Sequence, residues 1–150
     1  MKLYLVQHGD ALSEDVDPAR PLSERGRGDV ERIAARLREA PIRVAAIEHS
    51  GKTRARQTAE ILARAVGAAV TQRDGIAPND PVDPIARALA EQSADCMIVG
   101  HLPFMGRLVA RLCAAREDPP VVRFEPGAVA CLERDAGGWA LLWLLTPLLA

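Results

Sequence analysis

The chain has 150 residues, 49% hydrophobic and 26% charged, which is the composition of one ordinary globular domain. Its 20 acidic and 19 basic residues leave a net charge of -1, which indicates neither a nucleic-acid binder nor a membrane-surface binder. The three cysteines fit no disulfide framework and no zinc spacing, and a strand already beginning at Lys2 leaves no room for a signal peptide, so the cytoplasm is expected.

Short apolar runs alternate with helical patterns over the first two-thirds of the chain, and apolar runs alone follow. Strands are predicted over residues 2–7, 44–48, 69–72, 96–100, 121–124, 128–133 and 139–145. Helices are predicted over residues 23–40, 50–67, 82–92 and 103–112. Ser23 and Ser50 are the expected N-caps of the first two helices, and Gly67 is the expected end of the second.

This alternation predicts the fold class. Strands separated by helices favour a parallel sheet covered on both faces, and a final hairpin turning at residues 135–138 adds antiparallel strands. The expected fold is therefore a three-layer α/β/α domain, mostly parallel with an antiparallel edge, formed by residues 1–150 as a single domain. No repeat, linker or low-complexity segment divides it.

Two histidines directly follow predicted strands. His8 comes after the first strand and before Gly9, and His101 comes after the strand at 96–100. Ligands of open parallel sheets lie beyond the carboxyl ends of strands, so the two imidazoles are expected to face one pocket. Gly9 lacks a Cβ and would allow the backbone to approach a ligand closely.

The segment 50–58 adds a candidate anion site. It opens the second helix, whose free N–H groups and dipole favour an anion. Arg54 on its first turn offers a planar fork for phosphate oxygens, whereas Arg56 lies on another face. A metal site formed by His8, His49 and His101 is an alternative, but the spacing gives it little support. His49 is expected either on the surface or behind the residues that contact a ligand.

The motifs then resemble a known family. In order and separation, four motifs resemble those of the histidine phosphatase superfamily, which has a phosphoglycerate mutase-like fold. They are His8-Gly9-Asp10-Ala11 and the runs 20–26, 50–58 and 99–103. The short chain is most similar to the bacterial phosphohistidine phosphatases of the SixA type.

The resemblance implies a role for each matching residue. His8 matches the phosphorylated nucleophile, and Arg54 and His101 match the phosphate pocket. Further substrate contacts are implied for Gln7, Gly9, Arg20 and Ser50. It implies a phosphatase without metal or cofactor, acting on phosphohistidine in a phosphorelay or phosphotransfer protein, in signal transduction.

Gln7 departs from the family pattern, which has arginine before the nucleophile. Losing one charge-assisted contact costs about 1.5–3 kcal/mol, or one to two decades in rate. Two alternatives therefore stay open: a phosphatase for a small phosphate ester, and a weakly active or non-catalytic phosphoprotein-binding module. Asp80 is the candidate general acid. A dinucleotide-binding protein is disfavoured because His8-Gly9-Asp10 replaces a glycine-rich turn.

Overall fold

A computed structural model describes all residues from 1 to 150. The strands are β1 (Lys2–Gln7), β2 (Ala46–His49), β3 (Ala69–Gln72), β4 (Cys96–Gly100), β5 (Val129–Asp135) and β6 (Gly138–Leu145). The helices are α1 (Glu24–Arg38), α2 (Thr53–Val66), α3 (Asp83–Glu91) and α4 (Phe104–Ala114), followed by the short 3-10 helix η1 (Pro147–Leu149).

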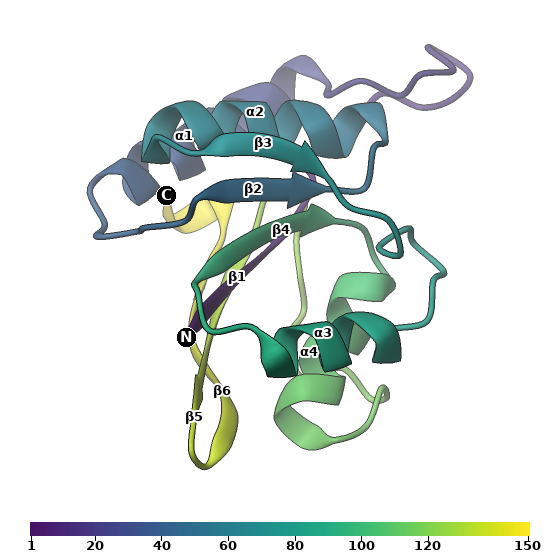
Figure 1. Ribbon diagram of the computed structural model, residues 1–150. Coiled ribbons are helices and arrows are strands. Elements are labelled where there is room, and N and C mark those ends of the chain that lie inside the picture. Colours follow the sequence, from purple (N-terminus) through teal and green to yellow (C-terminus); the bar gives the residue numbers. More distant parts are fainter.

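One six-stranded sheet forms the middle layer, in the order β3-β2-β4-β1-β5-β6. The first four strands of that order run parallel, while β5 is antiparallel to β1 and β6 to β5 (Figure 1). The expected parallel sheet with an antiparallel edge is thereby confirmed.

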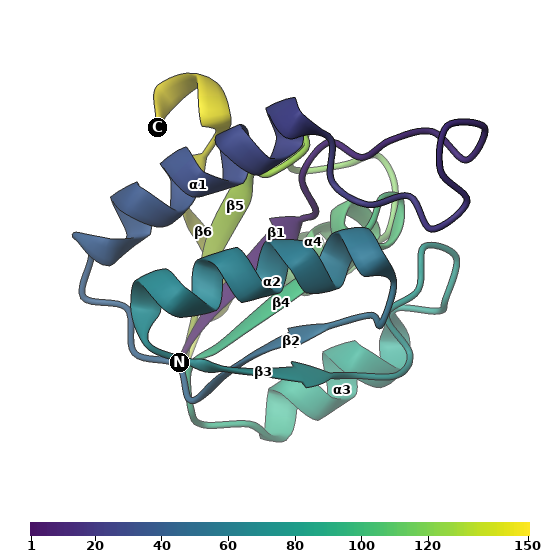
Figure 2. The same cartoon turned by 90° about the horizontal axis from the view of Figure 1, so that it is seen from above.

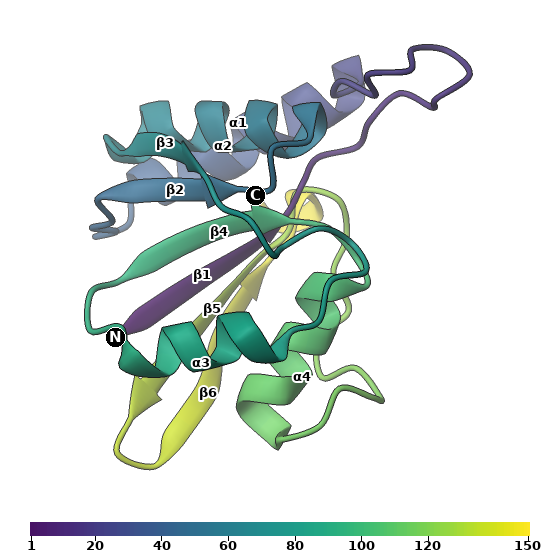
Figure 3. The same ribbon diagram turned by 45° about the vertical axis from the view of Figure 1, so that its right-hand side comes forward.

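Helices cover both faces of the sheet. Helices α1 and α2 lie on one face and α3 and α4 on the other (Figures 2 and 3). Side chains of β1 alternate accordingly, with Leu3 and Leu5 in the core under α3 and α4, and Tyr4 and Val6 in the core under α1 and α2. Each core contains 18 buried residues, so the central strands β1 and β4 are buried on both sides, while the edge strands β3 and β6 are largely exposed.

The two central strands, β1 and β4, set the position of the site. They pair in register, with Gln7 opposite Gly100. After β1 the chain leaves through α1 toward β2, whereas after β4 it leaves through α4 toward β5 on the opposite side of β1. The connections therefore diverge at the carboxyl ends of these strands, where open α/β sheets bind ligands.

The predicted strand at 121–124 is wrong. These residues form an irregular segment after Pro119 and Pro120, and the edge of β1 is already occupied by β5. The alternation that mimicked a strand has a packing cause, since Val122 and Phe124 are 5% and 6% exposed and enter the core under α3 and α4. Burial was expected for all three cysteines, but only Cys96 and Cys131 are buried, and Cys113 on α4 is half-buried. None of the helices has the length and apolar character needed to span a bilayer.

Candidate active site

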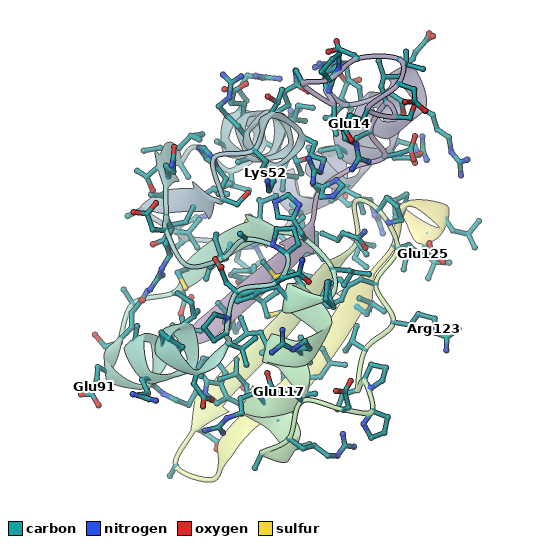
Figure 4. All side chains as sticks on the ribbon, turned by 90° about the vertical axis from the view of Figure 1, so that its right-hand side faces the viewer. Glu14, Lys52, Glu91, Glu117, Arg123 and Glu125 are labelled. Atoms are coloured by element: carbon teal, nitrogen blue, oxygen red, sulfur yellow. The ribbon has the colours of Figure 1, made fainter.

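The two strand-end histidines lie together. The His8 backbone N–H donates to the Gly100 carbonyl at 3.0 Å, and the ring centroids of His8 and His101 are 4.9 Å apart. The β1–β4 pairing thus brings the two imidazoles side by side at the carboxyl ends of the strands. Figure 4 looks onto this edge of the molecule, with Lys52, from the loop before α2, labelled above its centre.

The His8 ring is held in one tautomer. Its Nδ1 lies 2.7 Å from the Gly9 carbonyl oxygen, which has only lone pairs to offer, so Nδ1 carries the proton. Nε2 is then left with a free lone pair. Burial, to which the charge of Arg54 adds, lowers the pKa of His8 to about 4, so the ring is neutral at physiological pH. A neutral imidazole with an accessible Nε2 lone pair is a nucleophile.

Thr58 fixes the turn after His8. Its hydroxyl accepts a hydrogen bond from the Gly9 N–H at 3.0 Å and donates one to the Arg54 carbonyl at 2.8 Å. The Gly9 N–H is thus used inside the protein. A Cβ on Gly9 would lie 2.7 Å from Val30 Cγ2, so this glycine is required by packing against α1. The sequence carries no separate signal for this role of Thr58, because its contact with Gly9 joins residues 49 positions apart.

Arg54 reaches His8 from the first turn of α2. Its Nε donates to His8 Nε2 at 3.3 Å. Burial and the neighbouring charge of Arg20 lower the pKa of Arg54. Arg56 points elsewhere and pairs with Glu60 at 3.5 Å, as its position on another face predicted. Of the two, only Arg54 belongs to the site.

Ser50 is not the cap of α2. The helix begins at Thr53, and its N-cap residue Lys52 makes no side-chain capping bond. The Ser50 hydroxyl instead lies 2.6 Å from His101 Nε2. The chain makes one more turn through Gly51, at φ 91°, before the helix starts, and this turn carries Ser50 back over the end of β4. The predicted cap was wrong, but the residue belongs to the site.

Arg20 lies at the rim of the site in a loop tied to α2. It has a left-handed backbone with φ 47°, and its Nε donates to the Leu12 carbonyl at 3.1 Å. The Leu22 N–H donates to Gln57 Oε1 at 2.8 Å, which anchors the loop one turn from Arg54. The remaining guanidinium N–H groups of Arg20 are not used in these bonds, and its charge acts on His8 and His101 alike.

His101 lies deepest in the site, at 1% exposure. Burial first, then the neighbouring His8 and Arg54, lower its pKa to about 3, so this ring is also neutral at physiological pH. Two buried polar atoms have no partner, namely His101 Nδ1 and Gln7 Oε1. Buried polar atoms are normally paired, so both call for an explanation.

The remaining candidates lie outside this cluster. His49 is only 5% exposed, so of its two expected positions the surface one is wrong, and its Nδ1 accepts a hydrogen bond from the Gly51 N–H at 3.0 Å. No group of three potential metal ligands is assembled, so the three-histidine site does not form. The Asp80 carboxylate accepts from the Ala77 N–H at 2.9 Å, inside its own loop, and makes no hydrogen bond with His8.

The cluster has the chemistry of a site for a tetrahedral oxyanion. A neutral imidazole is surrounded by fixed cations and by the N-terminus of a 14-residue helix. A sequence model of the histidine phosphatase superfamily (branch 1) matches residues 3–78, which include His8 and Arg54. The chain belongs to the histidine phosphatase superfamily.

The similar proteins and structures cover between 71% and 99% of this chain. Phosphohistidine phosphatase SixA of Escherichia coli (strain K12) is 28% identical over 98% of this chain and 94% of its own. An uncharacterized protein of Picosynechococcus sp. is 35% identical over 71% of this chain and 69% of its own. A solved structure of the protein histidine phosphatase SixA complexed with tungstate superposes with a TM-score of 0.85 at 26% identity, covering 99% of this chain and 98% of that one. The phosphoglycerate mutase-like fold and the similarity to SixA are thereby confirmed.

Proposed function

We propose that this phosphatase removes the phosphoryl group from phosphohistidine in a partner protein, through a phospho-His8 intermediate. The observation that carries the proposal is the orientation of His8, whose Nδ1–H is bound by the Gly9 carbonyl at 2.7 Å, with Nε2 turned toward Arg54. The phosphohistidine phosphatase SixA, similar along almost the full chain, supports the same substrate class.

Phosphate binding is the first step of the proposed mechanism. The three equatorial oxygens of the phosphoryl group carry the negative charge that a protein can stabilise. Arg54 would turn from His8 Nε2 to one oxygen, and His101, Arg20 and the first N–H groups of α2 would contact the others. The positive charge thus comes from the chain itself, and the proposal requires neither a metal ion nor a cofactor.

Two in-line transfers follow. His8 Nε2 attacks phosphorus, a new N–P bond forms, and the N–P bond to the substrate imidazole breaks. The substrate ring takes a proton from bulk water at its other nitrogen, which an ordinary pKa near ~6.5 allows without a strong acid in the site, and it leaves as neutral imidazole. Water then attacks the phosphoryl group on His8. Both protons of that water leave with the phosphate as H2PO4⁻, and the His8 ring is neutral again. A readily protonated leaving group fits a cluster in which no carboxylate contacts His8.

A protein substrate also fits the surroundings of the site. The connection from β3 to α3 spans only residues 73–82, at the position where larger superfamily members carry a long insertion. A short connection leaves the carboxyl ends of β1 and β4 open to a docked protein surface. The cytoplasm, where thiols stay reduced, is the compartment we propose for a chain with three free cysteines.

Gln7 supports a second candidate. Its side chain carries no charge where the superfamily has arginine, so phosphate binding with slow or no turnover is the alternative function. Hydrolysis of a small phosphate ester is the other enzymatic alternative. The three candidate functions differ in what they require of His8. The phosphohistidine phosphatase and the small-ester phosphatase need it as a nucleophile, whereas the binding module does not.

The test compares a phosphohistidine protein with p-nitrophenyl phosphate as substrates. Wild type, His8→Ala and Gln7→Arg are assayed, with Arg56→Gln as a control on the outer face of α2. We expect wild type to prefer the phosphohistidine protein, His8→Ala to be inactive and the control to match wild type. Preference for the ester would favour the small-molecule phosphatase. Inert wild type with activity only in Gln7→Arg would establish a binding module.

A further inference from the structure

The two unpartnered buried atoms lie on neighbouring residues of the central strands. Gln7 is the last residue of β1 and pairs with Gly100, and His101 follows Gly100. Gln7 Oε1 can only accept a hydrogen bond, while His101 Nδ1 can donate one when protonated. Gln7 is at least nine-tenths buried and His101 is 1% exposed, so bulk water does not reach either atom. Each atom without a hydrogen-bond partner therefore costs free energy. The two atoms are chemically complementary.

Burial, and then the groups around His101, lower the pKa of this ring and keep it neutral. His8 faces it from the end of β1, Arg54 and Lys52 from the start of α2, and Arg20 from the loop before α1. All of these groups are neutral or positive, and no carboxylate contributes. The uncharged hydrogen-bonding neighbour of the ring is the Ser50 hydroxyl, which lies 2.6 Å from Nε2. An incoming dianion is therefore the first negative charge that His101 meets.

We propose that Gln7 couples anion binding to proton uptake at His101, so that an imidazolium supplies the positive charge that an arginine at position 7 would carry. The proposal rests on the phosphate pocket of the proposed function. In the loaded site Nδ1–H donates to Gln7 Oε1, and Nε2–H, released from Ser50, donates to an oxygen of the anion. The neutral ring already holds one proton, and the second comes from bulk water.

Glutamine suits this role and arginine does not. A guanidinium has no acceptor for Nδ1–H, and its fixed charge would oppose a second cation at His101. For His101 to be almost fully protonated at pH 7.5, its pKa must rise from about 3 to about 8.5 on binding. That rise corresponds to an anion that binds the imidazolium form roughly 300,000-fold more tightly than the imidazole form. A dianion in hydrogen-bonding contact supplies such a preference.

Calorimetric titration of the full chain with sodium tungstate measures the uptake directly. Tungstate is a tetrahedral dianion throughout the range from pH 6.5 to 8.5, so it takes no proton itself. Titrations at pH 7.5 in buffers of different ionisation enthalpy give the number of protons bound per ion. We expect close to one proton for wild type, and tungstate affinity that falls with rising pH. We expect almost none for His101→Asn.

Further variants show which histidine ring takes up the proton and whether the uptake depends on Gln7. His8→Asn should keep the uptake, because the proton goes to the other ring. Gln7→Arg should bind tungstate with little uptake and with an affinity nearly independent of pH. If Gln7→Arg does not fold, Gln7→Leu removes the same acceptor and should lower the uptake by at least half.

Three results would overturn the coupling: equal uptake in wild type and His101→Asn, loss of uptake in His8→Asn, or unchanged uptake in the Gln7 variants. Tungstate binding without uptake leaves the proposed phosphatase intact. Uptake without any phospho-His8 would overturn the phosphatase alone. Failure of wild type to bind tungstate at all would overturn both.

Discussion

Arg54 and His8 are hydrogen-bonded to each other through the nitrogen of His8 that is proposed to attack phosphorus. The Arg54 Nε donates to the His8 Nε2 lone pair at 3.3 Å, while the opposite nitrogen of the ring is held by Gly9 at 2.7 Å. The guanidinium thus marks the place where a phosphoryl group would enter, and the lone pair it covers is the one proposed to attack. Binding and nucleophilic attack both begin with the release of this contact.

Removing the Arg54 charge should slow the reaction strongly. Arg54→Gln loses a charge-assisted contact of about 1.5–3 kcal/mol, so kcat/KM should fall by roughly 10- to 150-fold. Arg56→Gln is the matched control, because Arg56 lies two residues on in the same helix and pairs with Glu60. Steady-state kinetics on a phosphohistidine protein give both values. Equal losses in the two variants would remove Arg54 from the site.

Thr58 should matter for stability as well as for activity. Thr58→Val keeps the shape of the side chain but leaves the buried Gly9 N–H without an acceptor. An unsatisfied buried donor costs about 1–3 kcal/mol in unfolding free energy. Thr53→Val, at the partly exposed start of the same helix, should cost much less. Urea unfolding of both variants measures the difference, and a Thr58→Val protein as stable as wild type would contradict the anchoring role.

The sequence predicted those parts of the site that strand ends define. His8 and His101 follow β1 and β4 directly, and parallel pairing in register brings them together. Arg54 was likewise predictable, because it lies on the first turn of a helix that follows a strand. These positions depend on local pattern and on the general geometry of parallel sheets.

The parts that long-range contacts define were not predictable. Ser50 has the residue type of a helix cap, and only the turn at Gly51 shows that it bonds His101 instead. Thr58 and Gln57 read as ordinary helical residues, yet their side chains hold Gly9 and Leu22, which lie over thirty positions away. The alternation at 121–124 reflects burial against helices, which a single sequence does not separate from a strand.

Two glycines of α1 should respond in opposite directions to substitution by alanine. A Cβ at Gly26 would collide with the Asp10 carbonyl, whereas a Cβ at Gly28 meets nothing within 4 Å. Gly26→Ala should therefore destabilise the protein by about 1–3 kcal/mol through overpacking. Gly28→Ala should stabilise it by about 0.5–1 kcal/mol, because alanine favours the helix. Thermal unfolding distinguishes the two, and a shift of the same sign in both would refute the packing of α1 on the loop after His8.

Acid should destabilise the fold through the two site histidines. Their folded-state pKa values lie near 4 for His8 and near 3 for His101, below the ordinary value of 6.5, so the unfolded chain takes up protons first as the pH falls. Stability is complete above pH 6.5 and is lost progressively down to about pH 4 and below, by a few kcal/mol in sum. Urea unfolding between pH 7.5 and 4 should show this slope, and His101→Asn should flatten it. An unchanged slope in the variant would assign the loss to other groups.

The central claim is that His8 carries the phosphoryl group during turnover. Rapid mixing with a phosphohistidine protein, alkaline quenching and mass spectrometry of the peptides test it directly. We expect one phosphoryl group on the peptide containing His8, stable in alkali, lost in acid and absent in His8→Ala. Continued phosphate release by a wild-type protein that shows no phospho-His8, or that carries the label on another residue, would contradict the account.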